Sequence, residues 1–274
     1  MKPVAFSYVA AGNAAEASAH LARAGDGAKL IAGGQSLAPM LNLRLVRPAA
    51  LVDIARATAM REVKDEGDAL VYGAAITHAE VEDGAVPDAT PGWLAGVACR
   101  IAYRAVRNRG TLGGSLAHAD PAADWVNALS ALGAEVVLGR GDALRTVVLT
   151  EFFTGPFATV LAPDEVILGI RVPKRGPAAR WGYWKFCRKV GDFAKASAAV
   201  LIDAERNETR VLLGAIERPP ILLADPLSLV AGQRDLAEAV TQAAPHLSEE
   251  SRALHAAALR RAIAIATSPM EAAA

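Results

Sequence analysis

Two glycine pairs stand out as residues whose types and spacing could hold a charged ligand. The first is Ala32-Gly33-Gly34-Gln35-Ser36, and the second is Thr111-Leu112-Gly113-Gly114-Ser115. A diphosphate needs several main-chain amides that point at it from close range, and only residues without a Cβ let the backbone come that near. Neighbouring hydroxyl and amide side chains can supply further donors. Both segments are therefore predicted to be loops that bind an anionic group.

Neither segment matches the two most familiar phosphate-binding motifs. No Gly-Lys-Ser/Thr follows, as a Walker P-loop requires, and the Gly-x-Gly-x-x-Gly spacing of a dinucleotide fold is absent from the sequence of both. One glycine pair is weak evidence, because most such pairs form ordinary turns. Two pairs favour one shared ligand, because several donors must together outweigh the roughly 4–15 kcal/mol that immobilising a ligand costs.

The sequence around these segments predicts short helices and strands that would position them. Helical spacing of apolar residues is found at 14–24, which a glycine turn at 25–27 ends, and at 92–106, directly before the second glycine pair. A further helix is predicted at 124–132. Short apolar runs predict strands at residues 29–32, 51–54, 70–74, 135–138 and 147–149.

A change of composition at residues 172–177 predicts a domain boundary. This segment contains two prolines, a glycine and two basic residues. Beyond it, residues 181–186, 198–202 and 211–215 are predicted to form an antiparallel meander, and the remaining Ala- and Leu-rich sequence is predicted to be helical. Ser248, followed by two glutamates, is predicted to cap the last helix.

Composition excludes several classes of protein. The chain has 274 residues with 29 basic and 29 acidic side chains, which argues against a strongly positive surface for nucleic acid. No run of about 18 uninterrupted apolar residues predicts a membrane span. Two cysteines without a disulfide framework, and no signal-peptide pattern, indicate a cytoplasmic protein with free thiols.

Two stretches around the glycine segments resemble the FAD motifs of the medium subunit of carbon monoxide dehydrogenase and related molybdenum hydroxylases: Ala32-Gly33-Gly34-Gln35-Ser36-Leu37 and Val106-Arg107-Asn108-Arg109-Gly110-Thr111-Leu112-Gly113-Gly114-Ser115. Further similar stretches are Ala117-His118-Ala119-Asp120-Pro121-Ala122-Ala123-Asp124, Tyr183-x-Lys185 and Gly191-Asp192-Phe193-Ala194. The resemblance implies an α+β fold of the vanillyl-alcohol-oxidase/PCMH type. It would have two FAD-binding α+β subdomains, at 1–57 and 58–173, and a C-terminal domain at 178–274 with a small antiparallel sheet and helices.

The same resemblance implies one FAD bound by this chain, with no catalytic side chain and no metal ligand. Ser36, Thr111 and Ser115 would donate to phosphate, Asp120 and Asp124 would accept from sugar or ribityl hydroxyls, and Lys185 would lie near the flavin. The full set implied is Ala32, Gly33, Gly34, Gln35, Ser36, Leu37, Thr111, Leu112, Gly113, Gly114, Ser115, Asp120, Asp124 and Lys185.

Function is implied in the same way. The FAD would take electrons from two-iron two-sulfur clusters of a small partner subunit, beside a large subunit with the molybdenum cofactor, and would pass them to an external acceptor. The assembly would be a dimer of heterotrimers. Two cysteines are too few for an ordinary cluster, which needs four thiolates, so this chain cannot hold the clusters itself. The alternatives are a self-contained FAD oxidase or reductase of the same superfamily and a nucleotide-binding scaffold without a redox cofactor.

Several other residues have less specific interpretations. His78 and His118 are predicted to be loop histidines, because no partner lies at metal-ligand spacing. The arginines at 100, 104, 107 and 109 are predicted to form a solvated helix face, on which Arg104 and Arg107 can be neighbours. Strand alternation places Trp181 and Tyr183 on the face opposite Trp184 and Phe186, so at most one pair can line a flavin.

Overall fold

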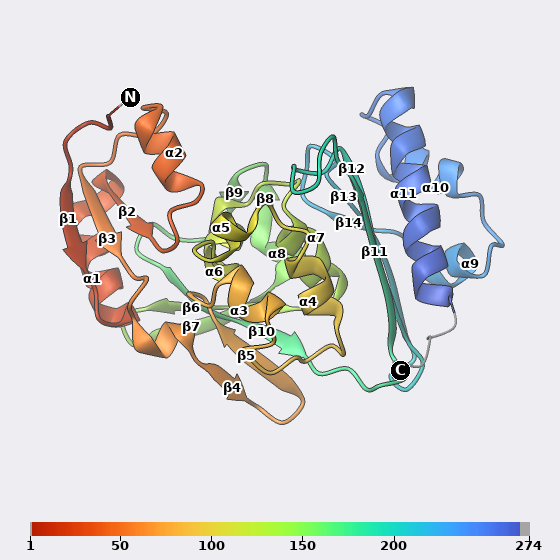
Figure 1. Cartoon of the computed structure of the whole chain (residues 1–274), viewed down its shortest axis with the longest axis horizontal. Helices are drawn as coiled ribbons and strands as arrows, with labels where there is room; N and C mark the ends of the chain where they lie inside the picture. Colours follow the sequence, from red (N-terminus) through yellow and green to blue (C-terminus); the bar gives the residue numbers. More distant parts are fainter. Residues whose placement is uncertain (1, 269–274) are drawn as a thin grey trace.

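The computed structural model describes residues 2–268, and its three main sheets follow one another along the long axis of the molecule (Figure 1). The ends of the predicted first and third domains, residues 1 and 269–274, lie outside this range. The first sheet is parallel, with strand order β1-β3-β2. Its elements are β1 (Ser7–Ala10), α1 (Ala14–Ala24), β2 (Ala28–Ile31), α2 (Leu37–Asn42) and β3 (Ala50–Asp53), with 3-10 turns at Gly25–Gly27 and Thr58–Arg61.

Helix α1 begins and ends where its sequence predicts. The Asn13 side chain accepts a hydrogen bond from the Glu16 amide, which satisfies one of the free donors of the first turn. Gly25, with φ of 57°, ends the helix in a conformation that costs glycine little. Ala17 and Leu21 are buried on the face that covers the sheet. The strands predicted at 29–32, 51–54 and 70–74 are also confirmed, as β2, β3 and β5.

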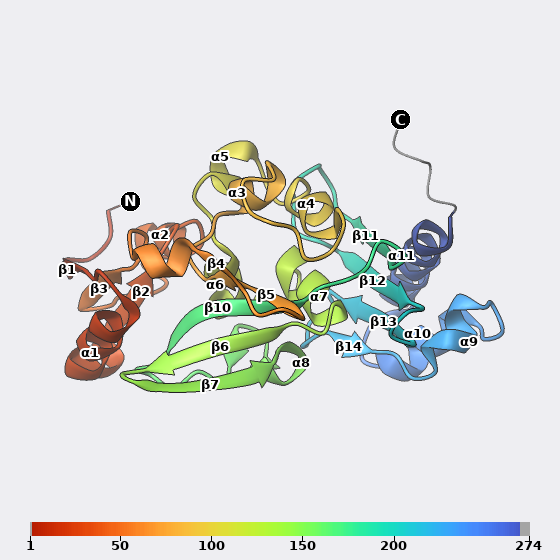
Figure 2. The ribbon, with the colours of Figure 1, turned by 90° about the horizontal axis from the view of Figure 1, so that it is seen from below.

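The second sheet is antiparallel and carries the central part of the chain. Its strand order is β4-β5-β10-β6-β7, and helices α3, α4 and α5 lie above it in Figure 2. The strands are β4 (Val63–Asp65), β5 (Ala69–Gly73), β6 (Glu135–Arg140), β7 (Ala143–Val148) and β10 (Val166–Pro173). The other elements are α3 (His78–Glu82), α4 (Trp93–Ala98), α5 (Arg104–Arg107), α6 (Leu112–His118), α7 (Asp124–Ala131), α8 (Leu149–Phe152), β8 (Phe153–Gly155) and β9 (Ala158–Thr159).

Two of the predicted elements in this region have different bounds in the structure. The single helix predicted at 92–106 is wrong, because α4 ends at Ala98 and α5 begins at Arg104. Between them Ala102 has φ of 42°, a left-handed conformation that no continuous helix can contain. The strand predicted at 147–149 is part of β7, and Leu149 already belongs to α8.

The third sheet confirms the predicted C-terminal meander. Its order is β11-β12-β13-β14, with α11 packed on β11 and β12 from one side and α7 on β12 and β13 from the other. The Ser248 hydroxyl accepts from the Ser251 amide, so the predicted cap of the last helix is confirmed. The elements are β11 (Arg180–Phe186), β12 (Ala196–Asp203), β13 (Glu208–Gly214), β14 (Ile221–Leu222), α9 (Pro226–Val230), α10 (Leu236–Ala243) and α11 (Glu249–Thr267).

Side-chain alternation along β11 divides the two hydrophobic cores. Trp181 and Tyr183 pack into the large core shared with α4 and α7, and Trp181 stacks on Trp93 with ring centroids 5.6 Å apart. Trp184 and Phe186 pack into the smaller core beneath α11. The predicted division of these four aromatic residues is therefore confirmed. No helix within residues 2–268 is both long and apolar enough to cross a bilayer.

The proline-rich segment predicted as a boundary lies between the second and third sheets. Arg175 in this segment is buried and forms ion pairs with Asp203 and Glu208, both in or beside the third sheet. A second hydrogen bond runs from Arg175 Nη2 to the Leu132 carbonyl at the end of α7, at 2.8 Å. Arg175 thus links the connecting segment to the third sheet and to the end of α7, and so helps to hold the third sheet against the helices of the second.

Candidate functional site

The first glycine segment lies between β2 and α2, as a loop. Gly34 has φ of 70°, which turns the chain, and the Gln35 side chain donates back to the Gly33 carbonyl at 3.1 Å. Within the described part of the chain, the main-chain amides of residues 33–37 donate to no protein acceptor. Such donors need a partner unless water reaches them. The loop therefore presents a run of five free amides, with the Ser36 hydroxyl beside them and Leu37 as the first residue of α2.

The second glycine segment is not the loop that the sequence predicts. Thr111 is the N-cap of α6, and its hydroxyl accepts from the Gly114 amide at 3.1 Å. Leu112 and Gly113 donate to the carbonyls of Ile76 and Ala74, at 3.0 and 2.9 Å. These glycines lie in the first turn of a helix, and position 113 needs glycine there because a Cβ would lie 2.5 Å from the Ala74 Cβ.

The exposed part of the second segment is correspondingly small. Leu112 and Gly113 are buried against the second sheet, whereas Gly114 is exposed and Ser115 is half-buried. The amide of Ser115 already donates to the Thr111 carbonyl. This segment therefore offers a close backbone surface and the hydroxyl of Ser115, while most of the free amide donors belong to the first segment.

The two segments meet through their backbones. A Cβ on Gly33 would lie 1.8 Å from the carbonyl oxygen of Arg109 and 2.9 Å from the amide nitrogen of Gly110. The Arg109 Nε also donates to the Gly33 carbonyl at 3.4 Å. The two glycine segments, which the sequence predicts to share one ligand, therefore lie close together, and contact is made through Gly33 and the residues just before Thr111.

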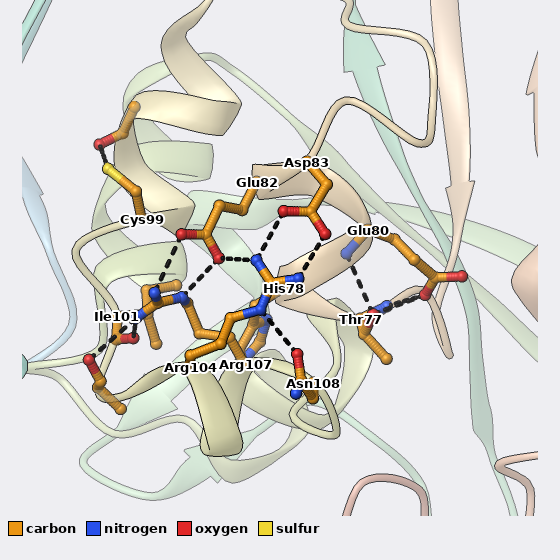
Figure 3. Close-up of polar contacts among 12 residues, drawn as sticks. Thr77, His78, Glu80, Glu82, Asp83, Cys99, Ile101, Arg104, Arg107 and Asn108 are labelled. Carbon is orange, nitrogen blue, oxygen red and sulfur yellow. Dashed lines mark hydrogen bonds and ion pairs between the residues drawn. The ribbon is translucent and has the colours of Figure 1, made fainter.

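Helices α3 and α5 hold the chain that leads into the second segment. Glu82 of α3 pairs with Arg107 at 2.7 Å and with Arg104 at 3.0 Å, as Figure 3 shows. Arg107 Nη1 also donates to the carbonyls of Ile101 and Ala102, at 2.9 and 3.1 Å. These hydrogen bonds stabilise the turn that separates α4 from α5, which explains why the long predicted helix does not form.

The predicted solvated arginine face is therefore wrong for part of the cluster. Arg107 has only 12% of its side chain exposed and Glu82 only 17%, while Arg104 also pairs with Asp83. Arg104 and Arg107 do share a face, as predicted, because both reach Glu82. The sequence signal for these partners is the acidic pair Glu82-Asp83, whose charge is opposite to that of the arginines.

His78 is a core residue and not a loop residue, which corrects the prediction. It is the first residue of α3 and 6% exposed, and its Nδ1 accepts from Trp125 Nε1 at 2.9 Å. Burial, with the nearby charge of Arg107, lowers the pKa of His78 to about 4, so the imidazole is neutral with its proton on Nε2. Its backbone amide donates to the Gly110 carbonyl, so His78 supports the second segment from below. His118 ends α6, half-buried, and is therefore not in a loop either.

Asp124 and Lys185 form a buried ion pair between α7 and β11. Lys185 Nζ lies 2.9 Å from Asp124 Oδ2, and the two side chains are 5% and 6% exposed. The Tyr183 hydroxyl donates to Asp124 Oδ1 at 2.8 Å. Burial raises the pKa of Asp124, and the neighbouring Lys185 charge and these hydrogen bonds partly offset that effect. Burial also raises the pKa of the Tyr183 hydroxyl, which therefore stays a donor.

Lys185 has committed its three N–H donors within the protein. Besides Asp124, they reach the carbonyls of Arg100 at 3.0 Å and Asp192 at 3.3 Å. Asp120 lies in the turn before α7, half-buried, and its side chain accepts from the Ala122 amide at 2.9 Å. Asp120 thus retains an open carboxylate oxygen, whereas both carboxylate oxygens of Asp124 have protein donors.

Comparisons with known proteins point to one family. Residues 4–175 match the family model described as FAD binding domain in molybdopterin dehydrogenase. The chain is 39% identical over 207 residues to the carbon monoxide dehydrogenase medium chain of Hydrogenophaga pseudoflava, covering 76% of this chain and 72% of that one. It is 37% identical over 227 residues to the caffeine dehydrogenase subunit beta of Pseudomonas sp. strain CBB1, covering 81% and 76% respectively.

The fold is similar to that of a solved structure as well. Carbon monoxide dehydrogenase from H. pseudoflava contains a chain that superposes with a TM-score of 0.88 and 32% sequence identity. The superposition covers 97% of this chain and 98% of that chain, so the likeness includes all three sheets.

Proposed function

The chain belongs to the family of FAD-binding medium subunits of molybdenum hydroxylase-type dehydrogenases, and from this membership we propose the step that it performs. The FAD of this chain takes electrons from iron–sulfur clusters of a partner subunit and passes them to an external acceptor. The family, the α+β FAD-binding fold, the FAD cofactor and the role as a flavoprotein subunit of an oxidoreductase are the parts of the sequence prediction that are confirmed.

The observation that carries the placement of FAD is the contact between the two glycine segments. Gly33 touches the backbone of Arg109 and Gly110 at a distance that only glycine permits, and five free amides lie next to that contact. A diphosphate fits such a surface, because a row of backbone N–H groups without side chains can approach its oxygens closely. We therefore place the diphosphate of FAD across this junction, on residues 33–37 and 111–115.

The remaining predicted residues take different roles in this placement. Ser36 and Ser115 donate hydroxyl hydrogen bonds at the diphosphate, and Asp120 accepts from a hydroxyl of the cofactor. Thr111 acts through the cap of α6, because its hydroxyl already accepts from Gly114. Lys185 and Asp124 position the surrounding elements, since both are saturated with protein partners.

FAD supplies the redox chemistry, and the protein supplies binding and orientation. The clusters must be held by another polypeptide, because this chain has two cysteines and one ordinary cluster needs four thiolates. The proposed assembly is a dimer of heterotrimers, in which a small iron–sulfur subunit and a large molybdenum-cofactor subunit accompany this chain.

The partner proposal is tested by purifying the tagged chain from cells that express its own partner proteins. A complex with iron and acid-labile sulfide at four irons per FAD, together with a molybdenum cofactor, would support it. The alternative, a self-contained FAD oxidase or reductase, predicts a chain that purifies alone and turns over a substrate through its flavin. That outcome would rule out the role as a subunit and would leave the FAD site itself in place.

A further inference from the structure

The arginines before the second glycine segment differ in whether a carboxylate neutralises them. Arg104 pairs with Glu82 and Asp83, and Arg107 pairs with Glu82, as the close-up in Figure 3 shows. Both charges are therefore compensated inside the second domain. Neither guanidinium is free to serve a ligand without breaking an ion pair.

Arg100 and Arg109 have no such partner among residues 2–268. Arg100 Nη1 donates to the Tyr183 carbonyl at 3.3 Å, which directs it toward the third sheet. Arg109 Nε donates to the Gly33 carbonyl at 3.4 Å. Within the described residues, Arg109 is the one cationic side chain that hydrogen-bonds to either glycine segment.

The position from which the Arg109 side chain starts is fixed by the backbone. The Arg109 amide donates to the Val106 carbonyl at 3.1 Å and the Gly110 amide donates to the same oxygen at 2.7 Å. On the other side the Arg109 carbonyl is in contact with Gly33. The guanidinium is exposed and therefore can turn from the Gly33 carbonyl toward a ligand at the junction without leaving its place in the fold.

A diphosphate bound at the junction would need a positive counter-charge, which Arg109 can provide. Backbone amides provide only partial positive charge, whereas a diphosphate carries full negative charges, and an anion bound without a counter-charge is costly. A guanidinium pairs with phosphate oxygens through two parallel N–H bonds, which lysine cannot reproduce. Of the four arginines at 100, 104, 107 and 109, Arg109 is the one that hydrogen-bonds to a glycine segment and has no carboxylate partner among residues 2–268.

We propose that Arg109 is a cofactor-binding residue whose guanidinium pairs with the diphosphate of FAD across the two glycine segments. Arg109 stands inside the second of the two FAD-like motifs but is not among the binding residues that the resemblance implied. The inference rests on the proposed placement of the diphosphate. It adds a counter-ion from the residues just before the second glycine segment, which itself has few free amides.

The experiment compares the wild-type chain, in the complex with which it purifies and freed of flavin, with Arg109→Met, Arg109→Lys and Arg260→Met. Arg260 is exposed on α11, beyond the third sheet from the glycine segments, so its loss changes net charge equally (Figure 1). FAD affinity is measured by flavin fluorescence at low and high sodium chloride concentrations. ADP, which has the diphosphate and no flavin, is measured by competition.

Arg109→Met is expected to weaken both FAD and ADP about tenfold at low salt, the lower end of the range for a charge-assisted hydrogen bond, because the site is exposed. The difference from wild type should shrink at high salt, since counter-ions screen an exposed pair. Arg109→Lys should recover part of the affinity, and Arg260→Met should match wild type. A purely structural role would not produce the salt dependence or the recovery with lysine.

Two outcomes would overturn the proposal, and they separate its failure from that of the placement. If Arg109→Met binds FAD and ADP as wild type does while Gly33→Ala loses FAD, the junction binds the diphosphate without this arginine. If both variants bind FAD normally, the diphosphate lies elsewhere and the placement is wrong as well.

Discussion

Replacing Gly33 with alanine would place a Cβ 1.8 Å from the Arg109 carbonyl oxygen and 2.9 Å from the Gly110 amide nitrogen. Both are backbone atoms, so no side-chain rotation can relieve the overlap. Ordinary contact begins at 3.4 Å, and the two glycine segments must therefore move apart by more than an ångström. Gly33 is only half-buried, so we expect the chain to fold with the two segments separated.

The cost to FAD follows from the hydrogen bonds that such a shift would break. Each charge-assisted hydrogen bond contributes about 1.5–3 kcal/mol, so losing two at one segment would cost about 3–6 kcal/mol. This corresponds to FAD binding weakened by about 10²- to 10⁴-fold. We expect the purified Gly33→Ala chain to retain little flavin, measured by absorbance after denaturation and by titration with FAD.

Gly27→Ala is the matched control for this experiment. Gly27 is also half-buried and its backbone needs no left-handed conformation, but its new Cβ would meet only the Ala49 Cβ, at an ordinary 3.5 Å. This variant should retain full flavin. If Gly33→Ala retains as much flavin as Gly27→Ala, the reasoning that the junction of the two segments binds the diphosphate is refuted.

Three further predictions concern the elements around the junction. Gly113→Ala should lower both the free energy of unfolding, by about 1–3 kcal/mol, and the flavin content, because the new Cβ would clash with Ala74 inside the core. Thermal unfolding measures the loss of stability, and a melting temperature equal to that of Gly33→Ala would contradict this prediction. Lys185→Met should destabilise the chain by about 3–5 kcal/mol at neutral pH, because it leaves the buried Asp124 unpaired. Because burial raises the pKa of Asp124, the folded chain binds a proton on this carboxylate more tightly than the unfolded chain does. The loss of stability in Lys185→Met should therefore shrink as pH falls toward about 4, and urea unfolding at a series of pH values measures it. The pKa of His78 is about 4 in the folded chain, below its ordinary value of about 6.5, because the buried imidazole stays neutral. The unfolded chain therefore binds a proton more readily, and the free energy of unfolding should fall by about 3 kcal/mol as pH falls from about 6.5 to 4. His78→Gln should flatten that part of the urea-derived pH profile, and a profile equal to that of wild type would exclude the buried neutral imidazole.

Local sequence patterns determined much of the secondary structure and part of the site. The caps at Asn13 and Ser248 work within one helical turn, so their residue types alone mark where α1 and α11 begin. The alternation along β11 assigns its aromatic residues to two cores, because successive side chains point to opposite faces of a strand. The glycine segments could also be recognised from the sequence, because only glycine has no Cβ and lets the backbone approach a ligand or another backbone closely.

Where the sequence prediction was wrong, a specific side-chain or backbone contact outweighed the local preference of the segment. Residues 92–106 have helical spacing, yet Arg107 stabilises the carbonyls of the turn at 101–102 and splits the helix. The second glycine pair has the composition of a loop, yet it lies in the first turn of α6, where Leu112 and Gly113 donate to the carbonyls of Ile76 and Ala74. His78 lies in the core because Trp125, far along the chain, donates to it.

The sequence by itself predicted candidate residues for a diphosphate site and the strand before the first glycine segment, because these follow from residue type and short-range spacing. Only the tertiary structure decided that Gly33 and Arg109, 76 positions apart, touch through their backbones. That contact depends on the first sheet packing against the second, and no pattern within either segment encodes the distance between them. Among residues 2–268, the same packing leaves Arg109 without a carboxylate partner, whereas Glu82 and Asp83 at the end of α3 pair with Arg104 and Arg107.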